Sequence, residues 1–383
     1  MSLISVMEKA KKDDKLKLDQ DTIVDPSKPV EVISTGSIII DKLIERGGIG
    51  RGRVTELYGL ESSGKTSVAL HVAKETQKLG GNVAYLDYES ALDMQYAKNG
   101  IGVDISEERF ALLQPQTLEE GCDLIGFLLD HYKESKIDCI IIDSVKAMTP
   151  RAVLEGMLSD EPPMALQARK IGNFLSKITK QIKTTGTAIL LLNQMTKNIK
   201  SNPYQGGGEY ETPGGLAVRF YATTRIQLKK VKTENINKLN DITGQIEEMP
   251  DTNIVKVSII KNKLGTPFRS AEIAIKFGKG VDNIRSIIDI AVNYGVIKKG
   301  GAWFSYKEDN GGFKLQGDAA MRAHLIQPEN KNLLIEIANK ISLGVDPEVE
   351  KEAKEQETLD IKAVEIYSKK ESKKKVKDDA ATV

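Results

Sequence analysis

The hydrophobic positions between residues 30 and 280 fall into short continuous runs that alternate with helical periods. Val83–Asp87, Asp138–Asp143 and Ala188–Asn193 are almost entirely apolar, and each ends in a polar residue. Such runs are typical of parallel strands that helices bury on both faces. Between the last two runs, apolar residues recur at helical spacing and predict one face of a long helix: Ile171, Phe174, Leu175, Ile178 and Ile182. The pattern predicts an α/β fold with a mostly parallel central sheet.

The pattern changes farther along the chain. Val218–Lys229 and Ile254–Lys261 are closer together and alternate more between apolar and polar residues, which predicts an antiparallel extension of the sheet. The polar segment between them, Glu234–Asp251, predicts a hairpin excursion. Helical periods around Ile284–Tyr294 and a short strand at Ala302–Tyr306 predict a small α/β lobe after the core.

Both ends of the chain depart from this pattern. The first residues carry a helical stretch around Leu3–Leu18 and then a proline-containing turn, which predicts an arm; a frayed terminus is the alternative. Val345–Asp360 holds seven acids and two lysines, whereas Lys362–Lys377 holds seven lysines and two acids, and such runs are usually solvated. We therefore expect four parts: an N-terminal helical arm (1–30), a large α/β core (31–280), a small C-terminal α/β domain (281–344) and a charged, disordered tail (345–383).

Composition narrows the class of protein. The chain has 55 Lys and Arg against 54 Asp and Glu, so any binding of nucleic acid must use local basic patches. Cys122 and Cys139 lie in apolar segments and are interpreted as small buried residues without disulfide or metal spacing. The three histidines, His71, His131 and His324, are scattered, which argues against histidine-based metal or acid–base chemistry. Without a signal-like or bilayer-length apolar run, we expect a soluble, cytoplasmic protein.

The most specific segment is Gly59–Thr66, which fits the phosphate-binding pattern G-x-x-x-x-G-K-[ST] in full. A strand-like segment precedes it and a helix-like segment follows, so the helix N-terminus would face an anion. Lys65 can reach the β- and γ-phosphates, and the hydroxyl of Thr66 can ligate Mg²⁺. A glycine-rich turn without function would rarely have both flanks. We expect these residues to bind a nucleoside triphosphate: Gly59, Glu61, Ser62, Ser63, Gly64, Lys65 and Thr66.

Polar residues that end neighbouring strands complete a candidate site for phosphoryl transfer. Asp143 ends one apolar strand and can support Mg²⁺ through water. Glu89, just beyond the strand that ends at Asp87, is the best candidate to orient an attacking water; a helix-capping acid is the alternative. Gln194 follows Asn193 at the end of the next strand, where its amide can sense a γ-phosphate.

Two irregular segments, Glu155–Met164 and Met195–Gly215, follow the strands nearest the candidate nucleotide site. The second is rich in Gly and Asn, and a long loop of this kind inside a compact domain is usually functional. We expect the two loops to couple the nucleotide state to a second ligand. Lysine and arginine side chains could contact phosphates and tyrosines could contact bases: Lys197, Lys200, Arg219, Tyr204 and Tyr210.

Together these motifs resemble the bacterial RecA recombinase family over roughly residues 30–330. The matching segments occur in the family's order: Ile33–Ser37, Tyr58–Thr66, Leu86–Asp93, Ile142–Val145, Leu192–Gln194, Ile260–Lys263 and Gly301–Tyr306. The resemblance implies a RecA-like P-loop ATPase core that forms a helical filament on single-stranded DNA, with ATP between protomers. It also implies homologous pairing and strand exchange with double-stranded DNA, in recombination and repair.

The resemblance also implies roles for single residues. Glu89 would activate water, Asp143 would support the metal and Gln194 would sense the γ-phosphate. Lys261 and Lys263 would reach across the interface to the neighbour's γ-phosphate, although two lysines that end a strand are usually solvated.

Adenine and DNA contacts are implied in the same way. Asp93 and Tyr96 would flank adenine, with ordinary surface and packing roles as the alternative. The DNA-binding loops would be Glu155–Met164 and Met195–Gly215. DNA contacts would come from Met164, Arg169, Lys197, Lys200, Tyr204, Gly214, Gly215 and Arg219. Single-strand-binding and mediator proteins are candidate partners, and no membrane is expected.

The chain also departs from the family pattern. Apolar and threonine-rich positions of the second loop are replaced by Lys, Asn, Tyr and three glycines, and Pro162-Pro163 stiffens the first. The acidic tail is followed by lysines. These departures would suit a member carried by a phage or mobile element. A hexameric DNA motor, of helicase or branch-migration type, is the alternative function, and a non-enzymatic mediator is another.

Overall fold

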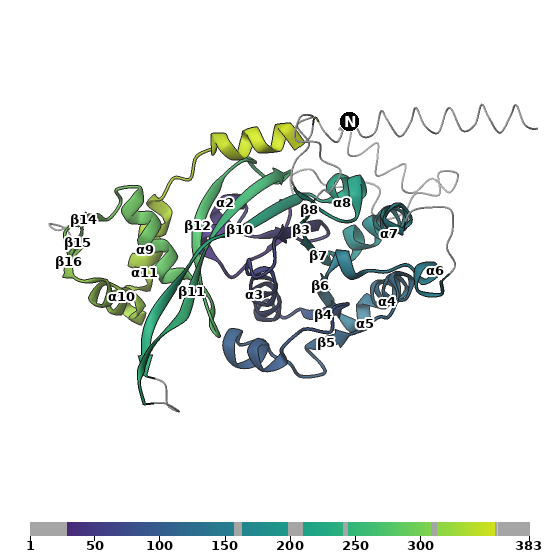
Figure 1. The fold of residues 1–383 in the computed structure, drawn as a ribbon, viewed down its shortest axis with the longest axis horizontal. Coiled ribbons are helices and arrows are strands. Elements are labelled where there is room, and N and C mark those ends of the chain that lie inside the picture. Colours follow the sequence, from purple (N-terminus) through teal and green to yellow (C-terminus); the bar gives the residue numbers. More distant parts are fainter. Residues whose placement is uncertain are drawn as a thin grey trace, which may run out of the picture.

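The computed structural model describes residues 29–156, 163–197, 210–239, 244–307, 312–356 and 358. Its core is a nine-stranded sheet in the order β13-β12-β11-β10-β3-β7-β6-β4-β5 (Figure 1). Strands β10, β3, β7, β6, β4 and β5 are parallel to one another, whereas β10 to β13 are antiparallel. This arrangement confirms the predicted fold class. The strands are β3 (Val54–Gly59), β4 (Asn82–Asp87), β5 (Phe110–Leu113), β6 (Ile137–Asp143), β7 (Ala188–Gln194), β10 (Thr224–Leu239), β11 (Ile246–Asn262), β12 (Ser270–Lys276) and β13 (Gly280–Asp282).

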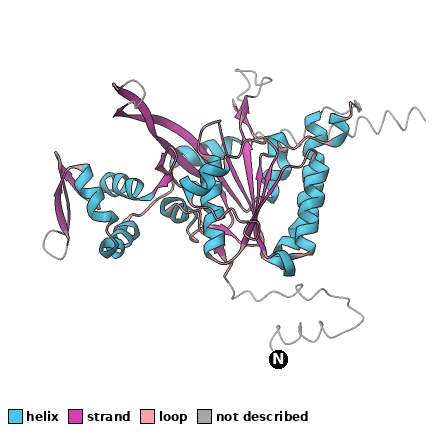
Figure 2. Ribbon diagram, turned by 90° about the horizontal axis from the view of Figure 1, so that it is seen from below, coloured by secondary structure: helices cyan, strands magenta, loops and turns pink. Residues whose placement is uncertain are grey.

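Helices cover both faces of the parallel strands (Figure 2). Successive residues of β6, such as Ile141 and Ile142, point into two different hydrophobic clusters, as a strand buried on both faces requires. α3 (Lys65–Lys78) packs on one face, and α4 (Leu118–Asp130) and α7 (Pro163–Thr185) on the other. The five apolar residues predicted for the long helix are all buried on α7.

Short elements complete the core and connect it to the C-terminal lobe. The core also contains β1 (Val32–Ile33), α2 (Ile38–Ile44), β2 (Ile49–Gly50), η2 (Tyr96–Ile101), α5 (Tyr132–Ser135), η3 (Val145–Ala147) and α6 (Arg151–Leu154). The lobe contains α9 (Asn283–Asn293), β14 (Lys298–Gly300), β15 (Trp303–Tyr306), β16 (Phe313–Gln316), α10 (Asp318–Ile326), η5 (Pro328–Asn330) and α11 (Lys331–Lys340). The side chain of Asn283 fastens the lobe to the core, because it donates to Gly36 O and accepts from Ile38 N.

The hairpin excursion is present, but the strand before it begins later than predicted. β10 and β11 pair from Thr224 to Leu239 with three register shifts. The start of the predicted Val218–Lys229 strand is instead helical, in α8 (Gly215–Tyr221). Val218 and Ala222 are four residues apart and both fully buried, which is helical spacing. The alternation there was too short to distinguish the two periods.

Two other segments differ from the expectation of irregular chain. The Met195–Gly215 loop has a two-stranded base, because β8 (Thr196–Lys197) pairs with β9 (Tyr210–Glu211). Pro163 already belongs to α7, so the first loop ends before Met164. Three segments lie outside the described residues: residues 1–28 of the N-terminal arm expected over 1–30, residues 157–162 of the first loop and residues 198–209 of the second loop.

Residues 347–356, at the start of the expected tail, form a helix on the core (Figure 1). Asp346 accepts a hydrogen bond from Ser270 Oγ, forms an ion pair with Lys256 at 3.0 Å, and donates its N–H to Phe268 O. Val349 is buried. Buried contacts of this kind offset the conformational entropy that the segment loses when it becomes ordered. Its charged residues alone could not offset that loss. The chain after residue 358 lies outside the described residues.

Candidate functional site

The candidate residues meet at the carboxyl edge of the parallel strands. Strand register sets this arrangement, because Gly59 pairs with Gln194 and Asp87 pairs with Asp143. In open α/β sheets, ligands bind outside the carboxyl ends of the strands. The polar strand ends recognised in the sequence therefore lie together.

The Gly59–Thr66 loop joins β3 to α3 and has the geometry of a phosphate cradle. Gly64 has φ of 90°, and a Cβ there would lie 2.3 Å from Ile275 Cδ1, so a side chain would clash. The ammonium of Lys65 donates to the carbonyl oxygens of Gly59 and Leu60 at 3.2 and 2.8 Å. Ser63 Oγ is buried without a hydrogen-bond partner among the described residues. An unpartnered hydroxyl at the start of a helix fits a phosphate ligand.

Burial lowers the pKa of Lys65, and the carboxylates of Asp143 and Glu89 oppose that shift. A triphosphate beside Lys65 would oppose it further, because an opposite charge favours the ammonium form. Glu61 and Ser62, also expected in the nucleotide site, are exposed on the loop.

Thr66 and Asp143 form the expected metal side of the site. Thr66 Oγ1 donates to Asp143 Oδ2 at 3.2 Å, and Tyr85 OH donates to the same oxygen at 2.6 Å. Burial raises the pKa of Asp143, while these two hydrogen bonds lower it. In the described ranges no group of three or more His, Cys, Asp or Glu side chains suits a metal ion. One carboxylate and one hydroxyl fit Mg²⁺, which is usually held with substrate phosphates and waters.

Glu89 lies at the centre of a hydrogen-bonded group. Its Oε1 accepts from Ser144 Oγ at 2.5 Å and from Gln194 Nε2 at 2.8 Å. Glu89 is exposed, so water can reach it. Asp87 is buried instead, and its carboxylate accepts the backbone N–H groups of Glu89 and Leu92 at 3.2 and 3.0 Å. Asp87 therefore shapes the turn that carries Glu89.

Sequence reasoning missed three residues that support this group. Tyr85 is the first, because its hydroxyl donates a hydrogen bond to Asp143. Lys146, on η3, donates to Gln194 Oε1 at 3.0 Å. Gln167, on α7, donates to three carbonyl oxygens of the η3 turn, those of Val145, Lys146 and Met148. The only signal in the sequence was the position of Lys146, three residues after a strand-ending carboxylate.

The residues expected around adenine lie at η2, beside the start of α3. Asp93 Oδ1 accepts the backbone N–H groups of Gln95 and Tyr96 at 2.8 and 3.1 Å. The hydroxyl of Tyr96 lies 2.8 Å from Ser67 Oγ on α3. This contact brings the half-buried Tyr96 ring close to the phosphate loop.

Asn193 connects the sheet to the second loop. Its Nδ2 donates to Glu56 Oε1 and to Pro213 O, both at 2.9 Å, and the residue is fully buried. Glu56 is in turn paired with Arg225 at 2.5 Å, in a site where both side chains are nearly inaccessible. The carbonyl at the exit of the loop is thus tied to β3 and β7.

The described DNA candidates lie on α7, β8 and α8. Arg169 is exposed on α7 and Arg219 is half-buried on α8. Gly214 and Gly215 have φ of 85° and 60°, and Gly214 caps the start of α8. Met164 lies in the first turn of α7 and Lys197 in β8, whereas Lys200 and Tyr204 lie outside the described residues.

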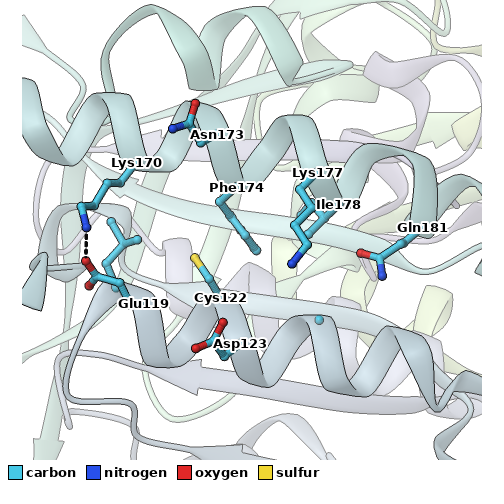
Figure 3. A pocket seen from close by; sticks show the side chains of 11 residues that line it. Glu119, Cys122, Asp123, Lys170, Asn173, Phe174, Lys177, Ile178 and Gln181 are labelled. Carbon is cyan, nitrogen blue, oxygen red and sulfur yellow. Dashed lines mark hydrogen bonds and ion pairs between the residues drawn. The ribbon is translucent and has the colours of Figure 1, made fainter.

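A separate cavity of about 260 Å³ lies between α4 and α7 (Figure 3). These two helices cover the face of the sheet opposite α3. Lys170 and Glu119 form an ion pair at one end, and Cys122 and Phe174 lie between the helices. Burial raises the pKa of Cys122 to about 12, which disfavours the thiolate form. Cys122 is half-buried rather than buried as expected; Cys139 is fully buried.

The phosphate loop, the acid at the end of β6 and the amide at the end of β7 define the chain as a P-loop ATPase with a RecA-like core. Family models described as the RecA N-terminal domain and the RecA C-terminal domain match residues 3–282 and 285–345. The chain belongs to the RecA family.

Curated relatives agree with this assignment. The chain is 39% identical over 313 residues to Protein RecA of Ruminococcus albus, covering 82% of this chain and 72% of the relative. It is 38% identical over 329 residues to Protein RecA of Nocardioides sp., covering 85% and 87%. For Protein RecA of Campylobacter fetus subsp. fetus, identity is 38% over 332 residues, covering 87% and 89%. As a family member, the protein is a DNA-dependent ATPase and recombinase of DNA repair. No helix in the described ranges is long and apolar enough to cross a bilayer.

Proposed function

We propose that the carboxyl edge of the sheet binds ATP and Mg²⁺, and that hydrolysis there controls a filament on DNA. The observation that carries this proposal is the convergence of Thr66 and Asp143 on one side with Glu89 and Gln194 on the other. These are the parts that phosphoryl transfer needs: a metal clamp, a base and a group that senses the terminal phosphate.

In this proposal the backbone and side chains of Gly59–Thr66 hold the phosphates, with Glu61, Ser62, Ser63 and Gly64 in the turn. Lys65 exchanges its carbonyl partners for phosphate oxygens, and Thr66 with Asp143 holds the metal, Asp143 through water. Bound Mg²⁺ would neutralise phosphate charge at the reacting group. Asp93 and Tyr96 flank the adenine.

Glu89 accepts a proton from the attacking water, while Ser144 and Gln194 hold its carboxylate in place. The Gln194 amide can exchange Glu89 for a phosphate oxygen, so the hydrogen bond between them reports the nucleotide state. Lys261 and Lys263 complete the site from the neighbouring protomer. ATP therefore acts at the joint between protomers.

Single- and double-stranded DNA would contact the loops at Glu155–Met164 and Met195–Gly215, with Arg169, Arg219 and the loop lysines on phosphates. Asn193 couples the second loop to the strand that carries Gln194. The arm over 1–30 would join protomers, and the lobe over 281–344 would flank the core. Single-strand-binding and mediator proteins are candidate partners.

ATPase rates with and without single-stranded DNA, combined with electron microscopy of the same samples, test this proposal. We expect stimulation by DNA and extended helical filaments. Lys65→Ala should lose ATP-dependent DNA binding, and strand exchange retained by this variant would contradict the mechanism. Closed rings with ATP and DNA would favour the hexameric motor, and DNA binding without ATP turnover would favour a non-enzymatic mediator.

A further inference from the structure

Lys146 adds a cation to the site that none of the expected roles includes. It is exposed on η3, three residues after Asp143. Its ammonium donates to Gln194 Oε1 at 3.0 Å, and Gln194 Nε2 donates to Glu89 Oε1 at 2.8 Å. Because an ammonium group can only donate, this contact fixes which end of the amide faces Glu89. Lys146 thus sets the orientation of the proposed phosphate sensor.

The backbone of Lys146 is held in place. Gln167 Nε2 donates to the carbonyl oxygens of Val145, Lys146 and Met148 at 3.1, 3.3 and 2.8 Å. Gln167 belongs to α7, which follows the first loop. A fixed backbone lowers the entropy cost of holding a long lysine side chain in one position.

The charge of Lys146 reaches the phosphate end of the site. Its partner Gln194 is paired across the strands with Gly59, at the start of the phosphate loop. Lys146 forms no ion pair with any described residue, and its hydrogen-bond partner is the neutral amide of Gln194. An ammonium group without a carboxylate partner, close to a phosphate loop, suits an added anion.

We propose that Lys146 orients Gln194 and contacts the terminal phosphate of a nucleoside triphosphate within its own chain. This inference rests on the proposed ATP site. It gives a single protomer a means to distinguish ATP from ADP before a neighbour supplies Lys261 and Lys263. Lys65 and Lys146 of the protomer that binds ATP would thus act before Lys261 and Lys263 of its neighbour.

Binding of ATPγS and ADP, both with Mg²⁺, to the dilute full-length chain without DNA tests the proposal by calorimetry. Lys146→Met keeps the length of the side chain and removes its charge. We expect it to weaken ATPγS binding by roughly tenfold, the scale of one charge-assisted hydrogen bond, and to leave ADP binding within about twofold. Lys146→Arg should keep most of the preference, because the charge and donors remain.

Lys78→Met is the matched control, since Lys78 is exposed at the C-terminal end of α3, pairs with Glu75 and should not alter the preference. An unchanged preference in Lys146→Met would overturn the proposal. So would an equal loss of both nucleotides, or a preference lost in a folded Lys146→Arg. A wild-type chain that binds neither nucleotide would instead contradict the proposed ATP site.

Discussion

The ammonium group of Lys261 donates to the carbonyl oxygen of Arg219 at 2.5 Å, at the C-terminal end of α8. It also donates to Phe220 O at 3.2 Å, and Lys263 Nζ lies 5.9 Å from the centroid of the Phe220 ring. Cations are favourable at such helix ends, where carbonyl groups lack partners. The two lysines expected to reach the neighbouring protomer are therefore bound to their own chain. The proposed reach to the neighbour would require these contacts to break, which would link assembly to the helix that follows the second loop.

The first prediction concerns the pH dependence of assembly. Burial, with the charges of Lys263 and Arg225, lowers the pKa of Lys261 from 10.5 to about 8. The ammonium loses its proton as the pH rises through about 8, so we expect filament assembly from free protomers to slow above this pH. Lys261→Arg should remove the effect, because a guanidinium stays charged. Light scattering on single-stranded DNA between about pH 6.5 and 9.5 measures the assembly rate.

Unfolding does not account for such a loss. The unfolded lysine binds protons more tightly than the folded one, so this group makes the fold more stable, not less, as the pH rises from about 8 to 10.5. A thermal melt at each pH provides the control. An assembly rate that is flat across pH 8 would contradict the role of Lys261, as would the same decline in Lys261→Arg.

The second prediction concerns Tyr85, whose hydroxyl lowers the pKa of Asp143 against the effect of burial. Tyr85→Phe removes that hydrogen bond, so the pKa of Asp143 should rise further. The metal needs the ionised carboxylate, which is lost as the pH falls through the pKa. We expect the acid side of the ATPase pH profile to move upward by about one unit, the scale of one hydrogen bond. Raised Mg²⁺ should restore activity.

Tyr132→Phe is the matched control for this variant. Its hydroxyl donates to Asp138 Oδ1 at 2.7 Å, away from the catalytic edge. The control removes a hydrogen bond of the same kind and should leave the ATPase profile unchanged. If Tyr85→Phe has the wild-type profile, Asp143 does not hold the metal in the proposed way.

The parallel strands and their polar ends could be predicted because their signals are local. The apolar run before Asp143 and the phosphate pattern at Gly59–Thr66 depend only on residues close in sequence. The carboxyl ends of parallel strands lie at the same edge of a sheet, so the pattern also predicts where these polar ends meet. The resemblance supplied roles such as that of Lys261, which spacing alone leaves open.

The supporting contacts could not be predicted, because they join residues far apart in sequence. Tyr85 reaches Asp143 across two strands, and Lys146 reaches Gln194 48 residues away. Lys261 was expected to reach a neighbouring protomer. Its carbonyl partner instead lies on α8, in a segment that the pattern predicts as a strand. Asp346 begins an ordered segment whose acidic composition favoured solvation. In each case tertiary packing outweighed the local pattern.

The third prediction separates binding from turnover. Glu89→Gln keeps the shape of the side chain but removes the base, so we expect ATP and DNA binding to persist while turnover falls by about 10²–10⁴. Single-turnover hydrolysis and a DNA-binding titration measure the two effects. Glu75→Gln is the control: Glu75 pairs with Lys78 on the surface of α3, where an ion pair contributes little. Normal turnover in Glu89→Gln would mean that another residue acts as the base.

The fourth prediction concerns the tie between the second loop and the sheet. Asn193→Ala removes the hydrogen bonds to Glu56 and Pro213 O and leaves a buried carbonyl without its donor. We expect the free energy of unfolding to fall by about 1–3 kcal/mol, the cost of an unsatisfied buried group. Because the exit of the loop is no longer fixed to β7, the stimulation of ATPase by DNA should fall more than the basal rate.

Asn82→Ala separates stability from coupling. Asn82 Nδ2 donates to Ser135 O at 2.9 Å at the opposite edge of the sheet, so its loss should destabilise the fold without altering stimulation by DNA. Denaturant unfolding and ATPase titrations with single-stranded DNA are measured on both variants. If both lose stimulation in proportion to stability, Asn193 has only a structural role. If Asn193→Ala alone loses it, the Pro213 carbonyl is a point through which DNA binding reaches Gln194.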